Sequence, residues 1–184
     1  MNIASLTKKI VALAVAVVGL AACISVDDFG SMWANMTTDS DIAGQWTDTT
    51  VGASKQGTAT VTIKDGSYDI ISMHDGKPDA PNNPVRTLTA GPYKFFAEKN
   101  PTTKGGNIAR YEIQDGKLVI YGPTDAVWEY VSKNYPKQKN MTMSEGLMQI
   151  MSIKVLDDEV VKILSEIPPG DVYWRADMTF TKNK

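Results

Sequence analysis

The sequence has little of the residues on which common catalytic and metal sites depend. Its 184 residues include one cysteine, Cys23, and one histidine, His74. A single cysteine cannot form a disulfide within the chain, and one histidine cannot build the usual zinc site. His74 precedes Asp75-Gly76, a turn signal, so we expect it in a surface turn. The sequence also lacks a Gly-x-Ser-x-Gly nucleophile motif and a calcium-loop pattern, so no enzyme and no metal site are predicted.

The sequence also has no excess of basic over acidic residues. The chain has 19 lysine and arginine residues against 21 aspartate and glutamate residues, a formal net charge of −2. Without residues 1–22, which hold two lysines and no acidic residue, the balance is 17 against 21, or −4. Nucleic acids and anionic lipid headgroups select basic surfaces, so we expect no nucleic-acid partner.

The apolar run near the N-terminus is shorter than a membrane span. Lys8 and Lys9 precede the apolar residues 10–19, and small residues follow as far as Cys23. A span needs about 20 apolar residues. A charged start, a short apolar centre and a small-residue end are typical of an export signal. An uncleaved N-terminal helix with a buried cysteine is the alternative.

Leu20-Ala21-Ala22-Cys23 resembles the lipobox of bacterial lipoprotein signal peptides. The resemblance implies that residues 1–22 are removed by cleavage between Ala22 and Cys23. It also implies a lipid on the Cys23 sulfur and acylation of the new N-terminus, with no other cofactor. Several acyl chains anchor a protein stably, because each buried CH₂ contributes about 0.8 kcal/mol. Ile24 follows in place of aspartate, which implies the outer membrane, on its periplasmic face.

The residues after Cys23 show little regular alternation of apolar and polar side chains. Ile24 to Ala43 is rich in aspartate, glycine, serine and threonine, with few periodic apolar positions. We expect residues 23–43 to be the lipidated N-terminus and a tether. The folded domain is expected over residues 44–184.

From Gly44 onward the apolar residues recur at every second position, which is typical of half-buried strands. Asp65-Gly66 and Asp115-Gly116 are strong hairpin signals, so the strands that they join are antiparallel. In the last strand Val172, Trp174, Ala176, Met178 and Phe180 share one face. The pattern predicts strands over residues 44–50, 57–64, 67–74, 85–90, 93–98, 107–114, 117–122 and 172–181.

A helical insertion is expected over residues 124–167, before the last strand. Thr124-Asp125-Ala126 can cap one helix, and Thr142 to Glu145 has capping-box spacing before Leu147. Apolar residues from Ile153 to Ile167 recur at helical intervals after the acidic residues 157–159. Two strands joined at Asp157-Asp158 are the alternative for residues 152–165.

Eight antiparallel strands in this length favour a closed up-and-down barrel, and a β-sandwich with a helical flank is the alternative. Gly44-Gln45-Trp46 resembles the Gly-x-Trp motif of lipocalins and other calycins. In that family the tryptophan closes one barrel end and an arginine of the last strand packs across it. The resemblance implies these roles for Trp46 and Arg175. Here the family's disulfides are absent and the helical segment precedes the last strand.

Aromatic and methionine side chains of the insertion are the candidate ligand contacts. Trp128 lies outside the strands and is the best candidate for an exposed binding aromatic, next to Tyr130. Met148 and Met151 belong to a cluster with Met141 and Met143. The cluster fits a core-filling helix face, a soft Cu(I) ligand set or an adaptable rim around a lipid-like ligand.

The sequence supports two functions for a lipid-anchored envelope protein. The first is a non-catalytic module that binds a small apolar ligand in the barrel. The second is a structural lipoprotein with a filled core that docks an envelope protein. An apolar cavity would favour the first, and a solid interior would favour the second.

Overall fold

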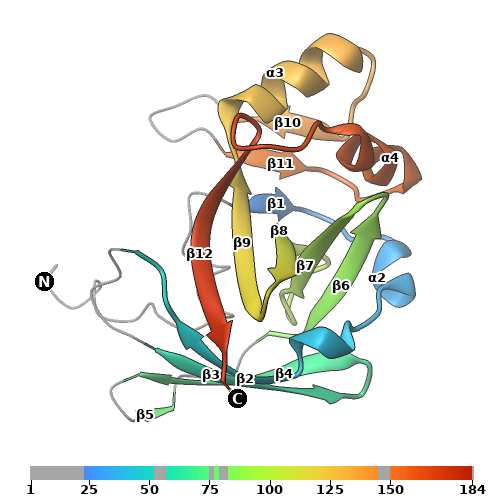
Figure 1. Cartoon of the computed structure of the whole chain (residues 1–184). Coiled ribbons are helices and arrows are strands. Elements are labelled where there is room, and N and C mark those ends of the chain that lie inside the picture. Colours follow the sequence, from blue (N-terminus) through green and yellow to red (C-terminus); the bar gives the residue numbers. More distant parts are fainter. Residues whose placement is uncertain (1–22, 52–56, 75–76, 79–82, 145–149, 184) are drawn as a thin grey trace, which may run out of the picture.

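The computed structural model describes residues 23–51, 57–74, 77–78, 83–144 and 150–183. It contains a closed barrel of eight antiparallel strands, each paired with the next along the chain and the last with the first (Figure 1). The barrel prediction is confirmed, and the sandwich is excluded. The barrel strands are β2 (Gly44–Asp48), β3 (Thr58–Lys64), β4 (Ser67–His74), β6 (Val85–Ala90), β7 (Tyr93–Lys99), β8 (Gly106–Gln114), β9 (Lys117–Pro123) and β12 (Trp174–Lys182).

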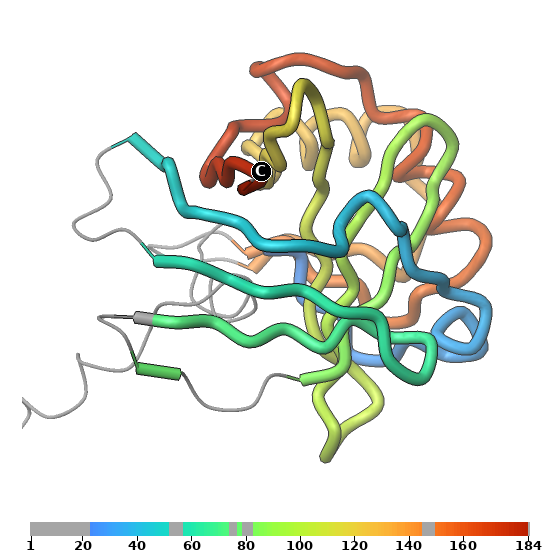
Figure 2. Tube along the Cα trace, turned by 60° about the horizontal axis from the view of Figure 1, so that its bottom comes forward, coloured from blue at the N-terminus to red at the C-terminus, as the bar shows by residue number. Residues whose placement is uncertain are grey.

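Both predicted hairpins are present, since β3 pairs with β4 and β8 with β9. Asp65, Gly66, Asp115 and Gly116 all have positive φ, between 51° and 73°. Two successive residues of this kind form the turn whose twist matches that of the flanking strands. β2, β3 and β4 run across the direction of β7 and β8 (Figure 2). The group β2–β4 is connected to the group that begins with β6 by a single residue pair, Tyr68 of β4 and Val85 of β6. The short strand β5 (Lys77–Pro78) adds to the far end of β4.

The prediction of a tether over residues 23–43 is wrong. β1 (Ile24–Val26) begins directly after Cys23 and pairs with both β8 and β11 (Met151–Ile153). Ile24 and Phe29 are each 1% exposed. Two short helices follow, α2 (Met32–Asn35) and η2 (Ser40–Ile42). The segment is folded because its apolar side chains cover the outer face of the barrel and, at Ile42, close one of its ends.

The insertion between β9 and β12 mixes helices and strands. Helix α3 (Asp125–Asn134) confirms the first predicted helix. The described ends of the helix expected after Thr142 are strands, because β10 (Met141–Met143) and β11 form an antiparallel pair. The rest of that prediction, residues 145–149, lies outside the described residues. Helix α4 (Asp158–Glu166) excludes the two-strand alternative over its length, and the Asp157 carboxylate caps it by accepting from the Val160 N–H at 2.9 Å. No helix in the described part of the chain is long and apolar enough to span a membrane.

Two hydrophobic cores lie on opposite sides of the barrel wall. A bulge in β12 at Asp177 turns Trp174 outward and Phe180 inward, so the expected single face of this strand is wrong. The outer core fills the space beneath α3, α4, β1 and β11 and includes Phe29, Phe95, Val127, Val160, Ile163 and Trp174. The barrel core includes Cys23, Ile42, Trp46, Tyr68, Phe96, Tyr111, Leu118, Ile120 and Phe180.

Candidate functional site

The axis of the barrel is occupied by its own side chains. Trp46, Tyr111 and Leu118 are each at most 1% exposed. The rings of Phe96 and Tyr111 stack with centroids 4.1 Å apart. Small barrels commonly fill their interiors in this way. The described pockets that touch the barrel interior therefore lie at its two ends.

One inward-facing row on β7 defines these two ends. Alternate residues of a strand face the same side, so Lys94, Phe96 and Glu98 all face the interior. Phe96 lies in the barrel core, while Lys94 and Glu98 lie on either side of it, about 13 Å apart along the strand. The Lys94 end is closed by η2, and the Glu98 end lies beside Cys23 and β1.

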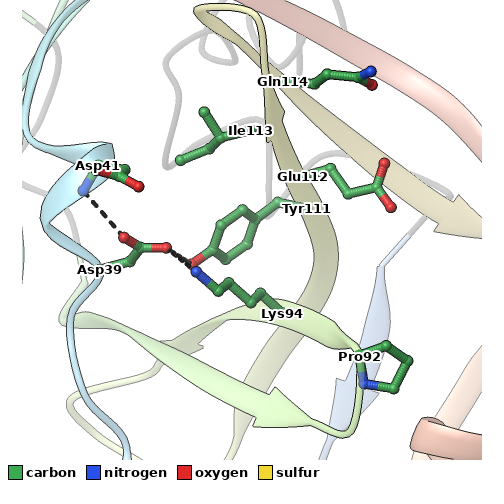
Figure 3. Close-up of a pocket in the computed structure, with 8 residues that line it drawn as sticks. All are labelled: Asp39, Asp41, Pro92, Lys94, Tyr111, Glu112, Ile113 and Gln114. Atoms are coloured by element: carbon green, nitrogen blue, oxygen red, sulfur yellow. Dashed lines mark hydrogen bonds and ion pairs between the residues drawn. The ribbon is translucent and has the colours of Figure 1, made fainter.

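At the Lys94 end a pocket of about 330 Å³ opens to the surface (Figure 3). The residues that line it include three carboxylates, one lysine and two apolar side chains, namely Asp39, Asp41, Glu112, Lys94, Pro92 and Ile113. Lys94 Nζ lies 2.5 Å from Asp39 Oδ2, and the Tyr111 hydroxyl donates to the same oxygen at 3.4 Å. Asp39 thus ties the segment before β2 to β7 and β8.

From Tyr111, which lines this pocket, a chain of hydroxyl groups leads into the barrel. The Tyr68 hydroxyl lies 2.9 Å from Thr87 Oγ1, which lies 3.1 Å from the Tyr111 hydroxyl. The Asp39 N–H donates to the Tyr68 hydroxyl at 2.5 Å. Burial raises the pKa of both tyrosines, so they stay neutral.

The charges at the Lys94 end stabilise one another. Burial by itself raises the pKa of Asp39. The Lys94 hydrogen bond and charge, together with the Asp41 N–H, outweigh burial, and the pKa of Asp39 is lowered overall. The same hydrogen bond to Asp39 raises the pKa of Lys94. Asp39 is therefore ionised and Lys94 protonated at neutral pH.

Trp46 lies in the barrel core, but Arg175 does not pack across it. The Trp46 indole is fully buried and its N–H donates to the Ile42 carbonyl oxygen at 2.8 Å. Lys182 takes the place expected for the arginine, with Nζ 5.3 Å from the ring centre. Gly44 lies against the same lysine, since a Cβ there would come within 2.8 Å of Lys182 Cε. Arg175 instead pairs with Asp177 at 2.8 Å and its side chain is 62% exposed.

The candidate ligand contacts of the insertion belong to the outer core. Trp128 is half-buried and packs against that core, so it is less exposed than expected, and its role as a binding aromatic stays a prediction. Tyr130 packs edge-on against Tyr173. Met151 is 2% exposed, and Met148 lies outside the described residues. The described members of this set fill the space between α3 and the barrel wall.

Cys23 packs into the barrel core at the Glu98 end. Burial, followed by the negative charges of Glu98 and Asp177, raises the pKa of its thiol to about 12. Since the thiolate is the reactive form of cysteine, the folded domain protects this sulfur from modification at neutral pH. Residues 1–22, with the cleavage residue Ala22, lie outside the described part of the chain.

The sequence interpretation missed Asp39, Lys94 and Glu98. No motif marks them, although Tyr93 to Ala97 contains four apolar residues among five, which is typical of a strand buried on both faces. Charged residues at Lys94 and Glu98, on the face shared with Phe96, are the available signal for two polar ends. Within the described residues no group of three or more histidine, cysteine, aspartate or glutamate side chains is placed to hold a metal ion.

Comparison with known proteins assigns no family. No family model matches the sequence, and no curated protein or solved structure matches it.

Proposed function

We propose that this protein is a lipid-anchored, non-catalytic binding module of the bacterial envelope. The proposal places its anchor at Cys23, on the periplasmic face of the outer membrane. The observation that carries it is the arrangement of Cys23 and the Lys94 pocket at opposite ends of one closed barrel. A lipid on Cys23 holds the Glu98 end at the bilayer, because β1 begins at the next residue and leaves no linker. The Lys94 pocket then faces away from the membrane.

Lipidation must precede folding in this proposal. The Cys23 side chain is buried and its thiol is protonated at neutral pH in the folded domain. Modification therefore takes place while the exported chain is still unfolded at the membrane. Once lipid is attached, the sulfur has to move out of the barrel end, while β1 keeps its pairing with β8 from Ile24 onward.

The ligand of this module binds at the barrel end and carries a polar group. The filled axis leaves the apolar part of a ligand only the rim, where Pro92 and Ile113 line the pocket. The half-exposed Lys94 ammonium and the exposed Asp41 carboxylate offer hydrogen bonds to the polar part, whereas the Glu112 carboxylate is paired with Arg110 and Tyr121. A small amphipathic molecule fits this chemistry better than a wholly apolar one.

A second candidate is a structural lipoprotein that docks an envelope protein. The filled barrel core favours it, since a solid interior is what this role requires and a ligand carrier does not. The binding module predicts a bound small molecule, and the structural lipoprotein predicts none.

Native mass spectrometry of the protein released from bacterial membranes separates the two candidates. The binding module predicts a stoichiometric small molecule on the wild type, lost in Lys94→Met. Lys162→Met, which changes an exposed lysine of α4, is the matched control and should keep the molecule. A mass free of any small molecule for all three proteins, with no change of tryptophan fluorescence on adding amphipathic probes, would contradict ligand binding.

A further inference from the structure

A second pocket lies at the Cys23 end of the barrel, opposite the one in Figure 3. Its volume is about 390 Å³. Its walls come from β1, from the chain before β6, from the end of β7 and from the start of β8. Ser25 on β1 and Glu98 on β7 both pair with Asn107 of β8, so these three residues lie side by side across adjacent strands.

The Glu98 carboxyl group is buried in this pocket and only half satisfied. The residue is 2% exposed. Its Oε1 accepts a hydrogen bond from Asn83 Nδ2 at 2.8 Å. Its Oε2 is fully buried and has no hydrogen-bond partner among the residues that the structure describes. Buried polar atoms almost always have a partner, so an unpaired carboxylate oxygen on a residue that lines a pocket points to a missing donor.

The charge around Glu98 favours a cation as that donor. The described residues that line the pocket include two carboxylates, Glu98 and Asp27, and no lysine or arginine. Lys94, on the same face of β7, is paired with Asp39 at the other end of the barrel. Burial raises the pKa of Glu98 more than the hydrogen bonds from Asn83 and Asn107 lower it. A bound cation would restore the ionised carboxylate.

We propose that this pocket binds a primary ammonium group through Glu98. An ammonium has three N–H donors, and Glu98 Oε2, Ser25 Oγ and the Asn107 side-chain oxygen supply acceptors from three adjacent strands that border one pocket. The pocket thereby provides both the charge and the directional hydrogen bonds that the group requires. This site is separate from the Lys94 pocket, so ammonium binding here does not depend on a ligand at Lys94.

Two sources can supply the ammonium. One is a free small amine. The other is the α-amino group that signal-peptide cleavage creates at Cys23, two residues before Ser25 on the strand that borders the pocket. The Glu98 charge acts on the Cys23 sulfur, which places the two groups near one another. The second source rests on the proposed cleavage and requires that the amino group escape acylation.

Calorimetric titration with methylammonium tests the site. The first sample is the full chain with Cys23→Ser, which retains residues 1–22 and so has no α-amino group at position 23. We expect methylammonium to bind and tetramethylammonium, which has the charge but no N–H donor, not to bind. Glu98→Gln should weaken methylammonium binding at least about tenfold. Glu129→Gln, at an exposed position on α3, is the matched control and should leave it unchanged.

The second sample, the processed chain from bacterial membranes, distinguishes the sources. If a free amine is the ligand, both forms bind methylammonium. If the Cys23 amino group is the ligand, only the unprocessed form binds it, because the processed chain fills its own site. The proposal is overturned if the unprocessed chain does not bind methylammonium, if it binds tetramethylammonium equally well, or if a folded Glu98→Gln variant binds as tightly as its parent.

Discussion

Lys182 lies over the indole ring of Trp46, with its ammonium nitrogen 5.3 Å from the ring centre. The same ammonium donates to the Asp41 carbonyl oxygen at 2.9 Å. β12 therefore fastens the N-terminal segment across the barrel end through a lysine, in the place where Arg175 was expected. The contact joins the last strand, the first barrel strand and η2.

This contact predicts that Lys182 matters more to stability than Arg175. Lys182→Met removes the interaction with the ring and the hydrogen bond to Asp41, and should lower the free energy of unfolding by about 1 kcal/mol. In the ion pair with Asp177 the arginine side chain is 62% exposed and the aspartate side chain 11% exposed, so Arg175→Met breaks a partly exposed pair and should cost less, about 0.5 kcal/mol. Urea denaturation of the two variants measures both values. Equal losses, or a larger loss at Arg175, would return the arginine to the role implied by the calycin motif.

Asp39 should make stability depend on pH in the acid range. Its pKa in the folded protein is lowered, so its pairing with Lys94 stabilises the fold above the unfolded pKa and is lost as pH falls through the folded value. Asp39→Asn keeps an acceptor for the Asp41 N–H but removes the charge. We expect the variant to be less stable than wild type by about 1 kcal/mol at neutral pH and by little near pH 2.

Denaturation at several pH values gives this difference directly. Glu129→Gln, an exposed change on α3, is the control and should follow the wild-type curve. A constant gap between Asp39→Asn and wild type at all pH values would show that the ion pair does not contribute as described.

The N-terminal segment should be part of the cooperative fold. Phe29 is 1% exposed in the outer core, and its ring lies 5.4 Å from that of Trp33. Phe29→Ala should therefore cost about 3–5 kcal/mol in the free energy of unfolding. Val51→Ala, at a fully exposed position, should change it by less than about 0.5 kcal/mol. If residues 24–43 were a tether, both variants would unfold like the wild type.

The Cys23 thiol should resist alkylation in the folded, unlipidated chain. A pKa raised from 9.0 to about 12 lowers the thiolate fraction at pH 8 about a thousandfold, and burial blocks access as well. The full chain, made without the lipidation machinery, should react with iodoacetamide rapidly in urea and very slowly without it. Similar rates under both conditions would remove the argument that lipidation precedes folding.

Most barrel strands were predictable because they carry alternating apolar residues, and two of the hairpins also carry an Asp-Gly turn signal. The predicted ranges 67–74 and 85–90 coincide with β4 and β6. β1 and β11 were missed because three-residue strands show too little alternation to be recognised. Their formation depends on edges offered by β8 and β10, which are distant in the sequence.

The polar ends of the barrel could not be read from motifs. The environments of Lys94 and Glu98 depend on closure of the barrel. Closure places Asp39 beside Lys94 and leaves Glu98 buried, with its Oε2 unpaired among the described residues. The bulge at Asp177 is a local irregularity that alternation alone cannot show. It explains why Trp174 and Phe180, which alternate correctly in the sequence, belong to different cores.

The most direct test of the proposed anchoring and orientation is the intact mass of the protein recovered from bacterial membranes. The account predicts a chain that begins at Cys23 and carries a thioether-linked lipid, recovered only with detergent. A chain that still begins at Met1, or one that is cleaved but carries no lipid and is released without detergent, would contradict it.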